Sequence, residues 1–367
     1  MIPINLPLIG EEEIEAVTKV MRKGPLTSAL GTGPVVTQFE QRFAEVAGVK
    51  HAVAVNTGTA ALHSAVLAAG VKQGDEIILP SFTFVATAEA VVLAGGKPIF
   101  TDIDPETYNL SPDEIEKNLT KKTKVILPVD IYGFSADSKP IREIAAKHDL
   151  AIIEDAAQAH GATYAGKPAG FFATAACWSL YASKNITTGE GGVTTTDSDE
   201  IANTLRLIRT HGEKDKYASI MLGCNYRMSE IQAAIGLVQL TKLPTFVAER
   251  RKNARRLTKL LSSSDRLKLP EESEERQHSW YLFTVRLKNA TENERNKIVE
   301  ELRKKGIGAV AYYVNPVHRM FYYQKTFGEF SLPETEKAAN QVFSLPVHPG
   351  VTETQIDYIG KTLLELL

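Results

Sequence analysis

Lys184 is the residue whose setting in the sequence most clearly indicates chemistry. It follows the largely apolar run 176–181 and precedes a glycine-rich turn at 187–192. An apolar strand that ends at such a turn would hold the amine in a partly desolvated setting, which favours its neutral, nucleophilic form. An amine of this kind can form a Schiff base with a carbonyl group. The alternative is that Lys184 extends from a strand end into solvent, as most lysines do.

A carboxylate and an amide follow a second apolar run. Asp155 comes directly after Leu150–Glu154, and Gln158 lies three residues further on. Ligands of an open parallel sheet bind outside the carboxyl ends of its strands, so both side chains are candidates for a site. Asp155 could keep a heteroaromatic nitrogen protonated, and Gln158 could hydrogen-bond another ring substituent. The alternative for Asp155 is a helix cap.

A turn of small residues at 57–61 joins a strand ending at Val55 to a helix. The free N–H groups of this turn would face a bound anion at the positive end of the helix, so the turn is a candidate phosphate cradle. Many strand-to-helix turns contain Gly-Thr, and the Gly-Lys-Ser/Thr of a nucleotide P-loop is absent.

Phe84 and Ser179 complete the candidate site. Phe84 follows a further strand and could stack on a flat ring, although it could equally be a core residue. Ser179 precedes Lys184 by five residues, which would place the two on opposite faces of a regular strand. Both can reach one site only if a bulge or turn intervenes.

The elements that must position these residues form an α/β pattern. Short apolar runs rich in β-branched residues alternate with helical patterns from residue 51 to about 200, which predicts a mostly parallel sheet with crossover helices. A helix opening at Ser111-Pro112 should carry a capping box. The expected strands are 51–55, 76–79, 97–102, 124–129, 150–154, 175–181 and 192–196, and the other helices are 59–69, 84–93 and 139–148.

The pattern changes near Leu243-Pro244, which predicts a large domain over 1–243 and a smaller C-terminal α+β domain over 244–367. A helix should begin near Ser229 on a weak cap signal. Beyond the boundary we expect helices at 247–261, 292–305 and 354–367 and strands at 280–287 and 309–313.

Composition excludes several classes of protein. The 367 residues are 43% apolar and 23% charged with a net charge of −2, which gives no electrostatic footprint for nucleic acid or an anionic membrane. Two cysteines exclude a disulfide framework and make a thiolate metal site improbable, so no metal is expected. The first residues lack the features of a signal peptide, and no apolar stretch approaches the roughly 20 residues of a spanning helix. A soluble cytoplasmic protein is expected.

Phosphate cradle, aromatic ring, carboxylate, amide and lysine are the parts needed to hold pyridoxal phosphate. With these parts the chain resembles the sugar aminotransferases of the DegT/DnrJ/EryC1/StrS family, within the fold-type I pyridoxal phosphate enzymes. The resemblance runs from 33–40 to 345–349 and is most specific at 154–161, 179–192 and 223–228.

The resemblance implies a fold-type I architecture with a mostly parallel seven-stranded-type sheet, and it implies roles residue by residue. Lys184 would form the Schiff base and act as acid/base catalyst, and Asp155 would bind the pyridine nitrogen. One departure is visible, because this chain has Asp130 where many members carry histidine. The remaining implied contacts are Gln158 to the ring hydroxyl, Gly58, Thr59, Ala60 and Ser179 to the phosphate, Phe84 to the ring face, Asn225 to the cofactor phosphate of a neighbouring subunit, and Tyr312 and His318 to the sugar.

The implied reaction moves an amino group from L-glutamate to a nucleotide-linked keto sugar, in amino sugar biosynthesis for polysaccharides, glycans or secondary metabolites. The implied assembly is a homodimer with shared active sites. Tyr312 and His318 could instead be a packed tyrosine and a surface histidine.

Four other functions compete with this one. The acceptor could be a non-nucleotide cyclic ketone such as an inosose, or an aromatic amine precursor. A related sugar 3-dehydratase would carry histidine in place of Lys184. An NAD oxidoreductase is suggested by Gly31-Thr32-Gly33, but a third glycine and a preceding strand are missing. A catalytically silent regulator would be expected to have lost Lys184 or Asp155, and both are present.

Overall fold

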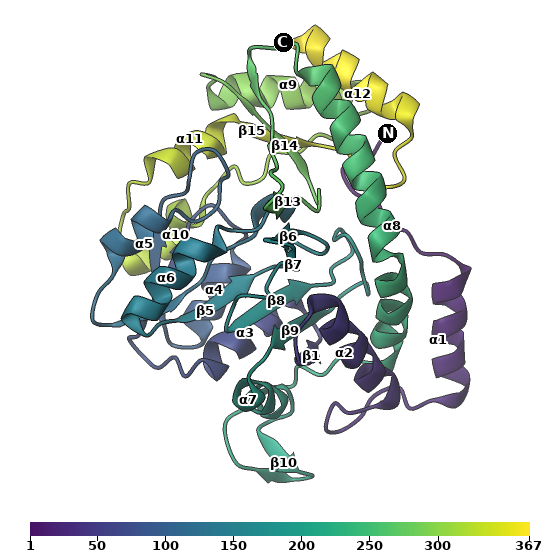
Figure 1. The fold of residues 1–367 in the computed structure, drawn as a ribbon, viewed down its shortest axis with the longest axis vertical. Helices are drawn as coiled ribbons and strands as arrows, with labels where there is room; N and C mark the ends of the chain where they lie inside the picture. The colour runs from purple at the N-terminus through teal and green to yellow at the C-terminus, as the bar shows by residue number, and fades with distance from the viewer.

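A seven-stranded sheet forms the centre of the molecule (Figure 1). The computed structural model describes residues 1–367. The strand order is β1-β9-β8-β5-β4-β2-β3, and only β9 runs antiparallel to its neighbours, so the predicted mostly parallel sheet is confirmed. The strands are β1 (His51–Val55), β2 (Glu76–Pro80), β3 (Lys97–Thr101), β4 (Thr123–Ile126), β5 (Ala151–Asp155), β8 (Ala175–Ser179) and β9 (Gly192–Thr196).

Helices cover both faces of this sheet, which explains the apolar strands. In β2, Ile77 and Leu79 pack into one core while Ile78 packs into another on the opposite face. Successive side chains of a strand point to opposite faces, so a strand buried on both sides must be apolar throughout. The connecting helices are α3 (Gly58–Ala68), α4 (Ala86–Leu93), α5 (Pro112–Asn118), α6 (Ser138–His148) and α7 (Asp199–Arg209).

The capping box expected at the start of α5 is not formed. Pro112 occupies the first turn as predicted, but the Ser111 hydroxyl makes no capping hydrogen bond. The backbone carbonyl of Ser111 accepts from the Glu114 amide over 3.1 Å, and the Glu114 carboxylate pairs with Lys117 over 2.6 Å. The Glu114 amide and the Glu114 carboxylate, which a capping box would use, therefore have other partners.

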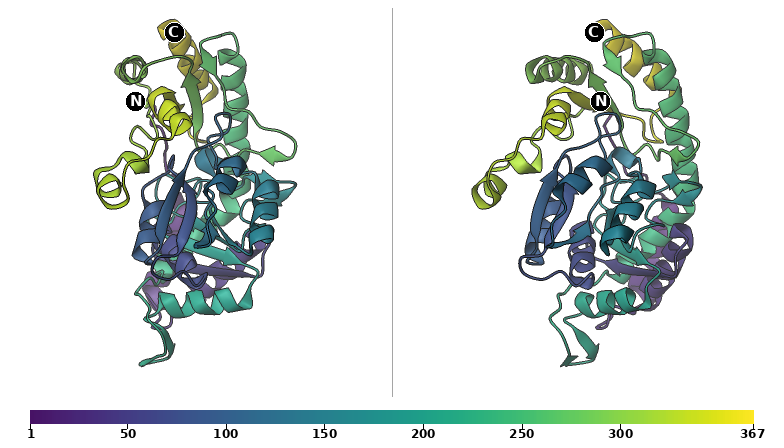
Figure 2. Two further views of the ribbon diagram at one scale, coloured as in Figure 1. Left: turned by 90° about the vertical axis from the view of Figure 1, so that its left-hand side faces the viewer. Right: turned by 60° about the vertical axis from the view of Figure 1, so that its left-hand side comes forward.

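A smaller antiparallel sheet lies beyond the large one (Figure 2). It packs against α9 (Glu292–Lys304) and α12 (Glu353–Leu366) around a separate apolar core. Ile2 bridges to Ile307, so the first residues of the chain join this part and not the large domain. Its strands are β12 (Leu267–Lys268), β14 (Phe283–Leu287) and β15 (Val342–Leu345), in the order β12-β14-β15.

The strand expected at 309–313 is absent. Only Val310 forms a bridge, to Ser344, and the chain then turns toward the large sheet. After this turn come η2 (Val317–Arg319), α10 (Phe321–Phe327) and α11 (Pro333–Gln341). The remaining elements are α1 (Glu11–Lys23), α2 (Pro34–Ala47), η1 (Ile131–Gly133), the short strands β6 (Thr163–Tyr164), β7 (Lys167–Pro168) and β13 (Arg276–Gln277), and a projecting hairpin of β10 (Glu213–Asp215) and β11 (Ala218–Ser219).

One long helix, α8 (Glu230–Leu261), runs along both parts of the molecule (Figures 1 and 2). Ser229 and Gln232 form a capping box, which confirms the predicted helix start. The expected break at Leu243-Pro244 does not occur, because the buried residues Leu243 and Val247 pack into the large core on either side of Pro244. The predicted boundary at 243/244 therefore lies inside a helix that both parts share.

The helix α8 also corrects an expectation about membrane spans. By length and composition alone it could cross a membrane, contrary to the expectation that no segment would. In this fold, however, it packs against α1, α2 and α12 and contributes buried side chains to two cores. Its apolar residues are explained by that packing.

Candidate active site

A cavity of about 770 Å³ lies at the carboxyl ends of the parallel strands, between the two parts of the molecule. It receives side chains from the large sheet and from the segment 311–320 that leaves the small sheet. The expected site residues that line it are Gly58, Thr59, Phe84, Asp155, Gln158, Ser179, Lys184 and Tyr312. A position at this edge of the sheet is where an open α/β fold binds its ligands.

The amino terminus of α3 forms one end of the cavity. A Cβ atom on Gly58 would lie 2.8 Å from Cβ of Ser179, so only glycine allows this approach between α3 and the end of β8. Ala60 needs a correction: it is buried, lies outside the cavity lining, and donates its N–H to Thr57 Oγ1 over 3.0 Å. The candidate anion-binding groups are therefore the first amides of the helix, at Gly58 and Thr59, with Ser179 beside them.

A turn after β8 brings Ser179 and Lys184 to the same cavity. The strand ends at Ser179, and the Lys184 amide donates to the Tyr181 carbonyl over 2.9 Å. A regular strand would place Ser179 and Lys184 on opposite faces, and this turn allows both to reach the cavity. Lys184 Nζ lies 4.6 Å from the ring centroid of Tyr281, whose hydroxyl is 3.0 Å from that of Ser183. The amine is thus held over an aromatic face at the cavity wall.

Asp155 presents a carboxylate that is only 5% exposed. Its Oδ2 accepts from Thr87 Oγ1 over 2.7 Å and its Oδ1 accepts from the Ala157 amide over 3.2 Å. Burial raises the pKa of this carboxyl, and the hydrogen bonds from Thr87 and Ala157 oppose the effect. A buried carboxylate is stabilised by a cationic partner, so a protonated ring nitrogen in the cavity would fit it well.

Gln158 and Phe84 offer a polar and an aromatic contact. The Gln158 carbonyl oxygen accepts from the Tyr132 amide over 2.8 Å, and its Nε2 donates to the Tyr313 hydroxyl over 3.2 Å. One amide proton remains for a ligand. Phe84 is 56% exposed and its ring lies 6.4 Å from that of Tyr313, so a flat ligand could cover its face.

Asn225 and His318 do not line the cavity. Asn225 is exposed, and only its backbone carbonyl is bound within the chain, by Asn56 Nδ2 over 3.4 Å. His318 is fully buried and hydrogen-bonded to Ser81, so it is neither the substrate contact nor the surface histidine considered from the sequence.

Among the lining residues that sequence reasoning did not propose as site residues are Thr87 and Tyr281, while Tyr313 was considered only as a neighbour of Tyr312 on the segment before His318. Thr87 stands in the same run as Phe84, and its place at the start of a helix facing a strand end was an available signal. Tyr281 and Tyr313 are different, because they reach the cavity only through irregular backbone that carries no sequence periodicity.

Asp130, the departure from the family pattern, lies behind the cavity and is completely buried. Its Oδ1 accepts from the Ala136 amide over 2.8 Å, while Oδ2 accepts no hydrogen bond. Burial, and next to it the neighbouring Glu154 carboxyl, raise its pKa well above the ordinary value. Asp130 therefore favours its protonated form.

The segment Gly31-Thr32-Gly33 lies between α1 and α2 with no strand before it. A dinucleotide-binding fingerprint requires a preceding strand, so the hypothesis that these residues bind NAD is wrong.

Comparison with known proteins agrees with this geometry. The chain is 39% identical to a pleiotropic regulatory protein of Geobacillus stearothermophilus, covering 99% of this chain and 98% of that protein. It is 37% identical to GDP-perosamine synthase of Caulobacter vibrioides, covering 100% and 98%. The PLP form of the putative sugar aminotransferase Spr1654 from Streptococcus pneumoniae superposes with a TM-score of 0.93 at 28% identity, covering 100% and 99% of the two chains.

The family itself is identified over nearly the full length. Residues 7–364 match the DegT/DnrJ/EryC1/StrS aminotransferase family. The family predicted from the motifs is thereby confirmed, and the chain belongs to the DegT/DnrJ/EryC1/StrS family of aminotransferases.

Proposed function

We propose that the protein is a pyridoxal phosphate-dependent aminotransferase that moves the amino group of L-glutamate to a nucleotide-linked keto sugar. The observation that carries the proposal is the single cavity at which Lys184, Asp155 and the Gly58 turn meet. The family and the similarity to GDP-perosamine synthase support the choice of reaction and acceptor. A regulator without catalytic activity would not need these three features at one cavity.

The residues present fit pyridoxal phosphate. The Gly58 and Thr59 amides and the Ser179 hydroxyl would hold its phosphate, because the α3 amino terminus is free of a side chain at Gly58. Asp155 would face the pyridine nitrogen, Gln158 the ring hydroxyl, and Phe84 the ring face. The cofactor, when bound, supplies an electron sink for the bond broken at the substrate carbon.

Lys184 would do the proton transfer. Its Nζ would anchor the cofactor and then take the proton from the α-carbon of glutamate, and deliver one to the sugar carbon that gains the amine. Asp155 keeps its charge available for the ring through the hydrogen bonds from Thr87 and Ala157. The aromatic wall formed by Tyr281, Tyr312 and Tyr313 would exclude water from the reacting atoms.

The size and lining of the cavity support a large second ligand. A volume of about 770 Å³ is in the upper part of the usual range for small-molecule sites, which exceeds the needs of one small cofactor. Polar and aromatic groups at Tyr312, Asn315 and Glu190 line the part that the cofactor residues leave free. Such a mixture suits a sugar with its nucleotide.

The assembly we propose is a homodimer with shared active sites. Asn225 is exposed outside its own cavity, and beside it lie the exposed apolar residues Tyr217, Ile220 and Leu222 of the hairpin region. An apolar group of this kind suits contact with a second chain. We also propose a cytoplasmic location, which fits the two unpaired cysteines, Cys177 and Cys224.

The test is mass spectrometry of products after incubation of the purified enzyme with pyridoxal phosphate, L-glutamate and a panel of nucleotide keto sugars. An aminated nucleotide sugar that is absent with Lys184→Ala supports the proposal. An inosose in the same panel tests the main alternative acceptor, and amination of the inosose alone would overturn the assignment of the acceptor class.

A further inference from the structure

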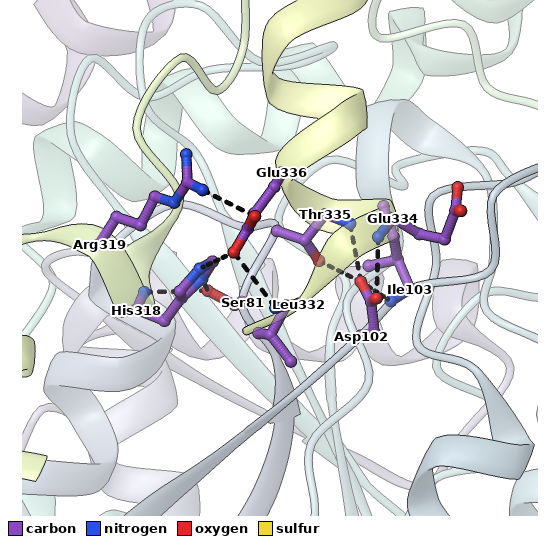
Figure 3. A network of polar contacts seen from close by, with 9 residues as sticks. All are labelled: Ser81, Asp102, Ile103, His318, Arg319, Leu332, Glu334, Thr335 and Glu336. Carbon is purple, nitrogen blue, oxygen red and sulfur yellow. Dashed lines mark hydrogen bonds and ion pairs between the residues drawn. The ribbon is translucent and has the colours of Figure 1, made fainter. Parts of the chain in front are cut away.

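A buried polar network joins the end of β2 to the segment that forms the opposite cavity wall (Figure 3). Ser81 follows β2 directly and is fully buried. Its hydroxyl lies 2.6 Å from His318 Nδ1 and accepts from the His318 amide over 2.9 Å, while its carbonyl accepts from the Val317 amide over 3.1 Å. One serine thus makes all three contacts that hold the start of η2.

These contacts favour one tautomer of His318. The Ser81 hydroxyl can donate its single proton to Nδ1 while its oxygen accepts the His318 backbone N–H. In that tautomer Nε2 carries the hydrogen, which faces Glu336 Oε1 at 3.4 Å. A directed chain of donors runs from Ser81 through His318 to Glu336.

Glu336 is itself fixed from the other side. Its second oxygen pairs with Arg319 over 2.7 Å, and its Oε1 accepts from the Leu332 amide over 3.2 Å. The helix that carries it, α11, is capped by Asp102, whose carboxylate accepts from the Thr335 amide over 2.7 Å. Asp102 follows β3 as Ser81 follows β2, so two neighbouring strands of the large sheet hold one segment of the small part.

The network lies between two walls of the cavity. One wall, residues 83–87, begins two residues after Ser81 and contains Thr87, which donates to Asp155. The other wall, residues 311–320, ends two residues after His318 and contains Tyr313, which accepts from Gln158. The Ser81–His318 contact is therefore the point at which the two walls are fixed relative to each other.

We propose that His318, held by Ser81 and Glu336, is a positioning residue that sets the substrate-facing wall 311–320 against the cofactor-facing wall 83–87. His318 does not line the cavity, and its role rests on the aminotransferase function proposed above. Loss of the contact should weaken substrate binding, because displacement of a positioning wall by about 1 Å can cost up to about 10²-fold. Cofactor binding should change little, since the wall 83–87 continues from β2 whether or not the contact is present, and Lys184, Asp155 and the Gly58 turn lie on other elements.

The experiment uses the holoenzyme and L-glutamate as the probe. Stopped-flow absorbance gives the limiting rate and the half-saturating glutamate concentration of the first half-reaction for wild type, Ser81→Ala, His318→Leu and the double variant. Ser135→Ala is the matched control, because Ser135 is also a buried serine but its hydroxyl has no partner. Glu336→Ala, at a partly exposed position, covers the case in which a buried variant fails to fold.

We expect half-saturation to rise about ten-fold in Ser81→Ala and less in Glu336→Ala, with the limiting rate and the cofactor spectrum nearly unchanged. The double variant should be no worse than His318→Leu, since the two changes remove one interaction. Ser135→Ala should match wild type. Unchanged half-saturation in Ser81→Ala and Glu336→Ala, or additive effects in the double variant, would overturn the proposal.

A second measurement is independent of the proposed function. Hydrogen exchange of the holoenzyme, followed on peptides that cover 311–320, should be faster in Ser81→Ala and unchanged in Ser135→Ala. Peptides from α3 and β5 should keep wild-type protection in both. If wild type does not react with glutamate but the 311–320 peptides lose protection, the proposed reaction is wrong and the positioning contact stands. Unchanged protection there contradicts the contact itself.

Discussion

Thr87 donates to Asp155 over 2.7 Å and so links the first turn of α4 to the carboxyl end of β5. The Thr87 oxygen lies 2.9 Å from that of Thr83, and because the Thr87 proton is used by Asp155, Thr83 must be the donor in that pair. The two threonines form a short relay that ends on the carboxylate. This relay, which belongs to the cavity wall 83–87, compensates the burial of Asp155.

Thr87→Val should weaken cofactor binding while the fold is kept. Valine matches the shape of threonine but leaves Asp155 without its strongest donor, which is worth about 1–3 kcal/mol for a buried group. We expect pyridoxal phosphate to bind several-fold more weakly, measured by fluorescence titration of the apoprotein. Thr83→Val is the control, because it removes a donor to Thr87 only. Equal losses in the two variants would contradict the order of the relay.

Lys184→Ala should lose turnover and the covalent attachment of the cofactor. General acid/base transfer is commonly worth about 10² to 10⁴ in rate, so the loss should be at least of this size. After borohydride treatment of the wild-type holoenzyme, peptide mass spectrometry should find the pyridoxyl group on the peptide that contains Lys184. Label on a different lysine would refute the assignment.

Gly58→Ala tests the proposed phosphate site by adding one methyl group and no charge. The added Cβ would meet Cβ of Ser179 at 2.8 Å, and overpacking of this kind typically costs about 1–3 kcal/mol. Fluorescence titration should show weaker binding of pyridoxal phosphate by about 5- to 100-fold. Gly10→Ala adds the same atom at ordinary contact distances of 3.7 Å and more, and should bind like wild type. A normal affinity in Gly58→Ala would show that the cofactor phosphate lies elsewhere.

The sequence predicted the sheet well, because several of its strands are short, largely apolar runs buried on both faces, as in β2 and β8. Strand ends meet at one edge of the sheet, and Asp155 and Ser179, the last residues of β5 and β8, accordingly both line the cavity. His318 could not be placed in this way. Its burial depends on Ser81, 237 positions away in the chain, and no local pattern reports such a pairing.

The helix break expected at Leu243-Pro244 is absent for a related reason. Pro244 predicts a helix break when only the local sequence is considered. Leu243 and Val247 nevertheless pack on either side of it into a core assembled from distant elements. Tertiary burial outweighs the local cost of proline there. The strand expected at 309–313 is also absent because of a tertiary contact: the chain leaves the small sheet there, and the Tyr313 hydroxyl accepts from Gln158.

Asp130→Asn should change how stability depends on pH. Burial raises the pKa of Asp130 above its ordinary value of 3.8, so the folded protein holds a proton that the unfolded chain releases. Its contribution to stability is complete below the ordinary pKa and is lost as pH rises through the raised value. Asparagine imitates the protonated form at every pH and can still accept from the Ala136 amide.

The gain in unfolding free energy of Asp130→Asn over wild type should therefore increase from pH 5 to pH 8, measured by denaturant titration. The exposed Asp113→Asn is the matched control and should show no such increase. A difference between Asp130→Asn and wild type that stays constant with pH would mean that Asp130 is ionised in the fold.

The proposed sharing of active sites between two subunits predicts that two inactive variants can restore each other's activity. Asn225 is exposed and lies outside the cavity of its own chain, so it can act on a cofactor only in a partner's site. In a hybrid of Lys184→Ala and Asn225→Ala subunits, one site carries both lesions and the other carries neither. Activity should return to a fraction of wild type after subunit exchange. The control mixes Lys184→Ala with Asp155→Asn: both residues line the cavity of one chain, so every site keeps a lesion and no activity should return. Exchange confirmed by mass spectrometry without recovery in the first mixture would show that Asn225 serves only its own turn.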